Sequence, residues 1–276
     1  MKYMQMLLPR SQSKKGIKMK TSKASFFVAK NKLLNALMLT ALAIPGAAMA
    51  EEASPISANV GFTSDYIFRG ISQTGHDPAV QGGLDYAHSS GFYLGVWGSN
   101  VGWIEDYQGY TSGNMEFDLY GGYRGGFDGT DVTYDLGAIQ YYYPGNRAAA
   151  TTDADTTELY AGLGWKWFAA KYSYVVSNGA FGFANADGSD YLDISASVPV
   201  GDTGLTAGAH WGTFSFKNNG AQDYDDWKLS LSYAMGSGVT VGVAYSDTNA
   251  NNAVWTDTNS EDLGEGKAFA WVSKSF

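Results

Sequence analysis

Apolar and polar residues alternate one by one along most of the chain after about residue 57. In residues 114–124, Met115, Phe117 and Leu119 fall on one side of an extended strand. Glu116 and Asp118 fall on the other side. The same period of two recurs in residues 158–167, 191–198, 226–235 and 239–246. Successive side chains of a β-strand point to opposite faces, so this pattern predicts strands with one apolar and one polar face.

Followed to the last residue, the alternation predicts twelve strands. They cover residues 57–69, 77–88, 91–101, 114–125, 131–143, 156–167, 169–177, 189–199, 204–216, 224–235, 238–247 and 265–276. Strands of soluble proteins average about five or six residues, whereas a barrel strand that crosses a bilayer needs about 9–11. The lengths therefore favour strands that cross a membrane.

The predicted connections alternate between long and short. Long ones follow the odd-numbered strands, at 70–76, 102–113, 144–155, 178–188, 217–223 and 248–264. Shorter ones follow the even-numbered strands, at 89–90, 126–130, 168, 200–203 and 236–237. Outer-membrane barrels have long loops outside and short turns in the periplasm. A soluble β-sandwich also has strands with alternating apolar and polar residues, but its architecture does not require long and short connections to alternate.

Aromatic residues gather near the ends of the predicted strands, where a membrane barrel carries its interfacial girdles. They include Tyr66, Phe68, Trp97, Tyr141, Tyr142, Tyr143, Trp165, Trp167, Trp211, Phe214, Phe216, Trp271 and Phe276. Hydrocarbon offers no hydrogen bonds, so an open sheet edge cannot persist in it. The fold class that follows is all-β: a transmembrane antiparallel up-and-down β-barrel of about twelve strands, spanning residues 51–276.

The first 50 residues have a different character. They contain nine Lys or Arg and no acidic residue, then an apolar stretch at 33–44 and the tripeptide Ala48-Met49-Ala50. A basic region, a short apolar core and a small-residue site are typical of a secretory signal peptide, which we expect to be cleaved after Ala50. The apolar core is too short for a membrane-spanning helix, which needs about 20 residues. We therefore expect export through the inner membrane to the outer membrane.

Cleavage would leave an acidic chain without cysteine. Nine basic and 27 acidic residues remain, a net charge of −18 compared with −9 for the whole sequence. This charge argues against nucleic acid as a partner, because phosphate is bound by Lys and Arg. The absence of Cys excludes disulfides, thiol catalysis and thiolate metal sites. No cofactor is predicted.

Several segments resemble one known family. They are Ser64-Asp65-Tyr66-Ile67-Phe68-Arg69-Gly70, Pro78-Ala79-Val80-Gln81-Gly82-Gly83-Leu84-Asp85-Tyr86, residues 91–100, Tyr141-Tyr142-Tyr143-Pro144-Gly145 and the ending Ser273-Lys274-Ser275-Phe276. Together they are similar to the TorF family of proteobacterial porins, formerly a conserved hypothetical group. The resemblance implies an outer-membrane barrel and a channel, but neither a substrate nor catalytic residues. The terminal Phe276 also resembles the membrane-insertion signal through which the barrel-assembly machinery binds the last strand, although Lys274 departs from that pattern.

The polar faces of the strands should line the interior of such a barrel. The candidate pore-lining residues are Asp65, Arg69, Asp85, Glu116, Asp118, Arg124, Asp135, Glu158, Lys166, Lys171, Asp193, Asp226 and Lys228. Acids outnumber bases among them, which favours cations in a pore. The alternative is that these groups only form salt bridges within the wall. For Arg69, four residues after Asp65, the alternatives are a constriction residue that binds solutes and an ion pair within the wall.

The predicted function is a porin-like channel for passive diffusion of small polar or ionic solutes, with lipid and lipopolysaccharide as neighbours. One alternative is a barrel enzyme that hydrolyses lipid or peptide. His76, His88 and His210 are its only histidines, and no Ser or Asp is placed near His210 by the sequence. The other is a structural or adhesive barrel whose acidic outer loops bind Ca²⁺ through oxygen ligands. These loops contain Glu105-Asp106, Asp153, Asp155, Asp187, Asp190, Asp223, Asp225 and Glu261-Asp262.

Overall fold

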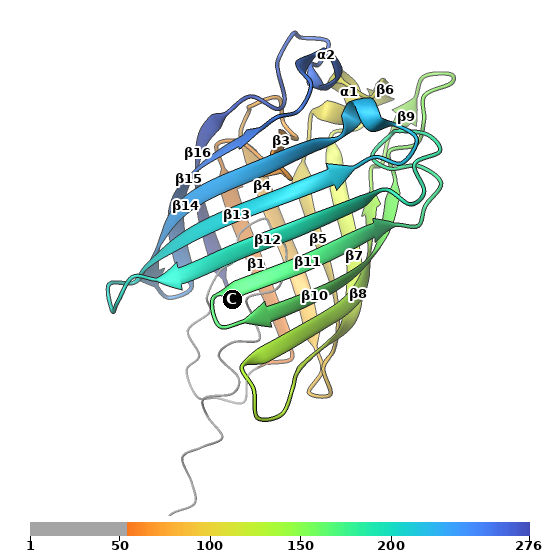
Figure 1. Cartoon of the computed structure of the whole chain (residues 1–276). Helices are drawn as coiled ribbons and strands as arrows, with labels where there is room; N and C mark the ends of the chain where they lie inside the picture. The colour runs from red at the N-terminus through yellow and green to blue at the C-terminus, as the bar shows by residue number, and fades with distance from the viewer. Residues whose placement is uncertain (1–53) are drawn as a thin grey trace, which may run out of the picture. The chain divides into compact units, whose positions relative to one another are not determined.

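Twelve antiparallel strands close into one barrel in the computed structural model, which describes residues 54–276 (Figure 1). The expected signal peptide at residues 1–50 lies outside the described residues. The barrel strands are β1 (Ile56–Thr63), β4 (Ala79–Ala87), β5 (Phe92–Asn100), β7 (Met115–Gly126), β8 (Val132–Tyr142), β10 (Thr156–Trp165), β11 (Phe168–Val175), β12 (Asp190–Pro199), β13 (Leu205–Ser215), β14 (Tyr224–Gly236), β15 (Val239–Thr248) and β16 (Lys267–Ser275). Each pairs with the next along the chain, so the predicted fold class and strand number are confirmed.

The barrel is sealed where its first and last strands meet. β1 pairs with β16 in a register that places Asn59 opposite Ser275 and Thr63 opposite Trp271. The ladder continues beyond the last paired strand residue, because the Phe276 amide donates to the Ala58 carbonyl at 2.9 Å. This seam satisfies the backbone groups that would otherwise form two open edges.

The prediction for the first strand is wrong at its end. β1 stops at Thr63 rather than at residue 69, and residues 64–78 turn inward. This infolded loop contains a small hairpin of β2 (Ile67–Phe68) and β3 (Ile71–Ser72). Its two turn residues, Arg69 and Gly70, both have positive φ (47° and 81°), as a tight hairpin turn requires.

The hairpin tip packs directly against the barrel wall. A Cβ on Gly70 would overlap Thr248 Cγ2 of β15 and would lie 2.5 Å from Asp226 Cβ of β14. A side chain at this position would therefore collide with the wall as well as strain the backbone. Glycine allows the chain to approach this closely, and the turn then places Arg69 inside the barrel.

Long and short connections lie at opposite ends of the barrel (Figure 1). The long loops contain α1 (Trp103–Asp106), β6 (Tyr110–Ser112), β9 (Asn146–Arg147), η1 (Gly220–Gln222) and α2 (Asn252–Trp255). β6 pairs with β9 and so joins two of these loops. The chain ends at the opposite end, with the short turns. Within residues 54–276, no helix is long and apolar enough to cross a membrane.

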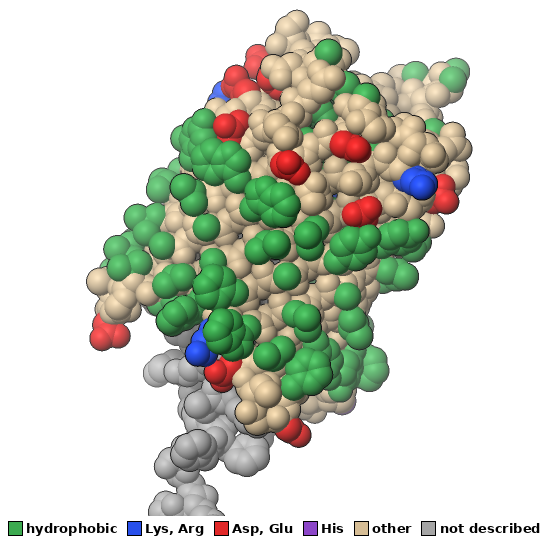
Figure 2. All heavy atoms as spheres, viewed as in Figure 1, with side chains coloured by type: hydrophobic (Ala, Val, Ile, Leu, Met, Phe, Trp, Pro, Cys, Tyr) green, Lys and Arg blue, Asp and Glu red, His purple; other side chains and the backbone are tan. Residues whose placement is uncertain are grey.

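The outer surface of the barrel carries an apolar belt. Large apolar side chains point outward and remain exposed along the strands, among them Leu94, Leu136, Leu163 and Leu229 (56% exposed). In Figure 2 these side chains spread across the middle of the barrel wall, and most charged residues in view lie toward its two ends. A belt of this kind on a soluble protein would be an unusually large exposed patch.

Only some of the predicted interfacial aromatics lie on this outer surface. Trp165, Trp167, Trp211 and Phe276 are exposed. By contrast, seven of the aromatic residues are buried or half-buried inside the barrel, where they pack against one another and the infolded loop: Tyr66, Phe68, Trp97, Tyr141, Tyr143, Phe214 and Phe216. The loop supplies an apolar environment at the mouth, so rings that point into the barrel need not reach lipid.

Glycines on the inner face make room for rings of the neighbouring strand. Directly opposed pairs are Gly95 with Tyr120, Gly137 with Tyr160 and Gly242 with Trp271. A Cβ on Gly137 would overlap the Tyr160 hydroxyl and would lie 2.8 Å from the Gly121 carbonyl oxygen. The high glycine content therefore matches the inward aromatic residues, a known way of covering glycine in sheets.

We expect the Gly137→Val substitution to destabilise the folded barrel. The new side chain would displace Tyr160 and press on the adjacent backbone, at a cost of about 1–3 kcal/mol, typical of overpacking. Gly126→Val is the matched control, because its Cβ would lie 3.6 Å from the Val132 carbonyl oxygen, an ordinary contact. Urea unfolding in detergent micelles measures both variants, and equal stability would contradict this packing argument.

Candidate functional site

The centre of the barrel interior contains one buried ion pair that crosses it. Arg69, at the tip of the infolded loop, donates to both carboxylate oxygens of Glu158 on β10 at 2.8 and 2.7 Å. Both side chains are almost completely buried. Bidentate pairing of this kind fixes a guanidinium in place and orients it. The pair thus anchors the loop to the wall opposite the point where Gly70 touches it.

Aromatic rings surround the Arg69 guanidinium. Its Cζ lies 4.3 Å from the ring centroid of Tyr191, 4.8 Å from that of Phe68 and 4.9 Å from that of Phe214. Cation–π attraction adds to the ion pair in such a water-poor setting. The sequence left a constriction residue and an ion pair within the wall as alternatives for Arg69. It forms an ion pair, but from a loop that reaches across the interior.

Two acids of β7 lie near this ion pair, because only β8 separates β7 from β10 in the barrel wall. Glu116 accepts a hydrogen bond from the Tyr66 hydroxyl at 2.7 Å. Asp118 is 1% exposed, and one of its oxygens has no hydrogen-bond partner among the described residues. An unpaired buried carboxylate oxygen is costly. Asp118 is therefore a wall acid whose carboxylate would be stabilised by a cation or a water molecule.

A second polar cluster lies nearer the short turns. Asp135 accepts a hydrogen bond from the Tyr93 hydroxyl at 2.6 Å, and Tyr93 contacts the Tyr160 hydroxyl at 2.5 Å. Arg124 lies over the Tyr93 ring and Lys171 over the Tyr160 ring. Separately, Tyr120 donates to Asp85 at 2.6 Å. The inward tyrosines thus bind the wall acids, a role that the sequence did not indicate.

His210 lies between two carboxylates, which the sequence did not foresee. Its Nε2 is 2.8 Å from Asp226 Oδ1, and its Nδ1 is 2.9 Å from Asp193 Oδ2 without hydrogen-bond geometry. The statement that no Asp is placed near His210 is therefore wrong. Both acids lie opposite Gly212 in the strand ladder, two residues beyond His210. The strand register, which the alternation alone does not give, brings them together.

This cluster has poor geometry for nucleophilic catalysis. Ser195 is the register partner of His210, so a serine does lie on the neighbouring strand. A catalytic histidine, however, must keep one ring nitrogen free to take a proton from the nucleophile. Here both nitrogens face carboxylates, and Tyr191 also approaches Nε2 at 3.1 Å. The arrangement fits a structural ion-pair cluster.

Lys166 does not lie on the inner wall. It occupies the exposed turn between β10 and β11, with positive φ (55°), and its Nζ lies over the Trp165 ring. The sequence placed the turn at Phe168, but Trp165 pairs with Phe168, so Lys166 and Trp167 form the turn. This two-residue difference removes Lys166 from the candidate pore-lining residues. Lys228 lies opposite His210 in the ladder, where its position is consistent with an inward side chain.

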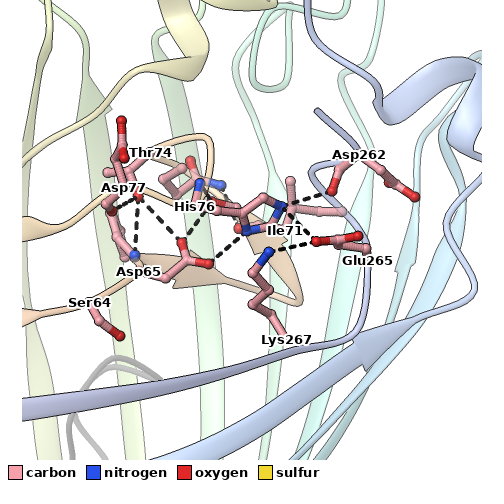
Figure 3. Close-up of polar contacts among 12 residues, drawn as sticks. Ser64, Asp65, Ile71, Thr74, His76, Asp77, Asp262, Glu265 and Lys267 are labelled. Carbon is pink, nitrogen blue, oxygen red and sulfur yellow. Dashed lines mark hydrogen bonds and ion pairs between the residues drawn. The ribbon is translucent and has the colours of Figure 1, made fainter. Parts of the chain in front are cut away.

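A further polar cluster lies at the mouth, where the infolded loop meets the loop that follows β15 (Figure 3). His76 Nδ1 is 2.8 Å from Asp65 Oδ2, and Nε2 is 2.9 Å from the Asp262 carbonyl oxygen. The hydrogen bond with Asp65 raises the pKa of His76 above its usual value. Because β1 ends at Thr63, Asp65 lies at the base of the infolded loop rather than on a barrel strand.

The acidic loops contain no ready metal site. Among residues 54–276, no group of three or more His, Asp or Glu is placed to hold a metal ion. Asp153, for example, pairs with Arg147 at 3.0 Å, and Asp223 accepts from the Phe216 amide. Several of these acids therefore hold loop structure, and calcium binding stays an untested prediction.

Taken together, the charged side chains around the infolded loop are almost completely shielded from solvent. Six charged residues are nearly inaccessible to solvent: Asp65, Arg69, Glu116, Asp118, Glu158 and Asp226. Side chains that line a water-filled pore would be wetted. The side chains around the infolded loop therefore do not line a water-filled pore in this structure.

We expect the Glu158→Gln substitution to release the loop while the barrel stays folded. Removing one partner leaves the Arg69 guanidinium buried and unpaired, which typically costs about 3–5 kcal/mol. Leaving the interior relieves that cost, so trypsin should cleave after Arg69 much faster than in the parent protein. Glu105→Gln, at an exposed position of α1, is the control. Equal protection of Arg69 in both variants would contradict the anchoring role of Glu158.

Solved structures give a weak overall likeness. The KdgM porin shares 9% identity, with 80% of this chain and 99% of that chain covered and a TM-score of 0.49. The NanC porin shares 12% identity, with 79% and 98% covered and a TM-score of 0.49. The outer membrane protein OprD from Pseudomonas aeruginosa shares 14% identity, with 82% and 66% covered and a TM-score of 0.39. No curated protein matches the chain.

A family model gives a firmer assignment. It matches residues 47–276, which include the whole barrel and the C-terminal Phe276. The model is described as a bacterial protein of unknown function, Gcw_chp. The TorF name given by resemblance is not tested by this match. The chain belongs to the Gcw_chp family.

Proposed function

We propose that this protein is an outer-membrane channel for passive diffusion of small polar or ionic solutes, with a preference for cations. The observation that carries the proposal is the division of the barrel into an apolar outer face and a charged inner face. A closed barrel with this division suits a bilayer, because every strand pairs on both sides. A protein whose interior served only as a core would not need buried charges, which are expensive to desolvate.

The proposed location follows from the same features. A signal peptide at residues 1–50 would export the chain, and the barrel-assembly machinery would bind its last strand through Phe276. The exposed ring of Phe276 and the seam between β1 and β16 support this role. The long loops would then face outward toward lipopolysaccharide, and the short turns would face the periplasm.

The proposed cation preference rests on the charges of the wall. The inward acids are Asp85, Glu116, Asp118, Asp135, Glu158, Asp193 and Asp226, and the inward bases are Arg124, Lys171 and Lys228. Arg69 offsets Glu158 only while the infolded loop stays in place. Once the loop moves, the wall becomes more acidic and attracts cations.

We expect the purified protein to give discrete conductance steps in a planar bilayer, with a reversal potential that indicates cation preference. Glu158→Gln should increase the open fraction, because it frees the loop. In that background, Asp118→Asn should lower the cation preference, because one Asp118 oxygen is buried without a hydrogen-bond partner among the described residues. Asp202→Asn, in an exposed short turn, is the control. A folded barrel that stays silent in both the parent and Glu158→Gln forms would overturn the channel proposal.

We expect Leu229→Arg to impair folding into lipid vesicles. Leu229 lies near the middle of β14 and points outward. Arg at the bilayer midplane on the lipid face of a barrel costs about 2–4 kcal/mol. Thr203→Arg, in a short turn between β12 and β13, should cost little. Urea titration of refolding into vesicles compares them, and equal midpoints would show that water rather than hydrocarbon covers Leu229.

A further inference from the structure

His76 connects the infolded loop to another long loop through both ring nitrogens. Nδ1 contacts the Asp65 carboxylate, which lies at the start of the infolded loop. Nε2 contacts the Asp262 backbone carbonyl, which belongs to the loop between β15 and β16. Asp65 and His76 belong to the same infolded loop, whereas Asp262 lies 186 residues after His76 along the chain. Figure 3 shows the His76 ring between Asp65 and Asp262.

Only a doubly protonated imidazole satisfies both contacts. A carboxylate and a backbone carbonyl are both acceptors, so each ring nitrogen must carry a hydrogen. Neutral histidine has one N–H, and its other nitrogen would present a lone pair to an acceptor less than 3 Å away. Loss of one proton therefore turns an attractive contact on one side of the ring into a repulsive one.

The surrounding charges are mainly acidic. Glu265 Oε1 lies 3.9 Å from Nε2 and is itself paired with Lys267 at 2.6 Å. The second oxygen of Asp65 accepts from the Ser72 and Thr74 hydroxyls, at 2.7 and 3.3 Å. Asp77 and Asp257 lie on segments next to this cluster, and Glu261 adds to the field at Lys267. Lys267 is the single base among them, and it opposes the protonation of His76.

The same cluster is hydrogen-bonded to the hairpin that carries Arg69. Ser72, which Asp65 binds, belongs to β3 of the inner hairpin, and its amide donates to the Leu263 carbonyl at 2.8 Å. The His76 amide in turn donates to the Ser72 hydroxyl at 2.9 Å. Movement of His76 away from its acceptors would therefore loosen the base of the hairpin whose tip pairs with Glu158.

We propose that His76 is a pH-sensitive latch: as an imidazolium it ties the infolded loop to the loop after β15, and on losing a proton it releases the infolded loop from the interior. The gating part of this inference rests on the proposed channel function. The release part does not, because it concerns only the position of the loop.

The direction of the pH effect follows from the contacts. The folded protein holds His76 with a raised pKa, mainly through Asp65. The latch is therefore fully formed below the ordinary histidine pKa of about 6.5, and it is lost as the pH rises through the raised value. The loop should be closed in acid and released in mildly alkaline solution.

Trypsin cleavage after Arg69 reports release without any need for conduction. We expect the full-length mature protein in detergent to be resistant at about pH 6 and cleaved at least ~10-fold faster at about pH 9, each rate taken relative to cleavage after the exposed Lys166 in the same sample. That ratio removes the pH dependence of trypsin itself. His76→Gln, which is neutral at every pH, should be cleaved rapidly throughout.

Two further variants make the test specific. His88→Gln changes a histidine in a short turn at the other end of the barrel, where its Nδ1 contacts only the Ser90 hydroxyl and amide. It should behave like the parent protein. Asp65→Asn removes the main cause of the raised pKa and should shift the transition to lower pH. An unchanged transition in His76→Gln, or its loss in His88→Gln, would overturn the latch.

Conductance measured over the same pH range separates this inference from the channel proposal. Steps that become more frequent as the pH rises, in the parent protein but not in His76→Gln, support both. If conductance steps and cleavage after Arg69 both occur equally at every pH, the latch proposal is wrong and the channel proposal stands. Silent bilayers with pH-dependent cleavage overturn the channel and leave the latch.

Discussion

The structure depends on the pairing of every backbone amide and carbonyl in the wall. β1 and β16 must meet, because an unpaired edge in hydrocarbon would expose a row of donors and acceptors with no partner. The seam from Asn59 to Thr63 satisfies this constraint. Once the sheet is closed, alternation along each strand decides which side chains meet the surroundings and which enter the barrel. Closure of the sheet therefore produces both the apolar belt on the outside and the charged interior.

Closure also creates the problem that the interior must solve. Charged side chains that point inward lose water unless the barrel is open, and buried charges need partners. Here an infolded loop packs inside the barrel at the end with the long loops, and it supplies Arg69 for Glu158 and Tyr66 for Glu116. Tyrosines of the wall bind other acids, such as Asp135. In the proposed channel, the contacts that stabilise the closed interior are therefore the contacts that would have to break.

The strands could be predicted from the sequence because a period of two follows directly from strand geometry. Most predicted strand ends lie within one or two residues of the observed ends. The predicted strands 189–199 and 204–216, for example, correspond to β12 (Asp190–Pro199) and β13 (Leu205–Ser215). The infolded loop could not be predicted in this way, because Tyr66, Phe68 and Arg69 continue the alternation of β1 while the chain turns inward. Only Arg69-Gly70, as a two-residue hairpin turn, carried a local signal. The contact of His210 with Asp193 and Asp226 needs the register across three strands, which alternation does not fix.

A barrel that spans the bilayer has hydrocarbon on the outer face of its strands and none on the inner face. The chain has no cysteine, so single cysteines at positions 227 to 233 of β14 can each carry a spin label in lipid vesicles. Electron paramagnetic resonance then measures collision of each label with oxygen, which concentrates in lipid, and with a water-soluble nickel complex. We expect strong oxygen access at 227, 229, 231 and 233 and weak oxygen access at 228, 230 and 232. Strong access of the nickel complex at 229 and 231 would contradict it.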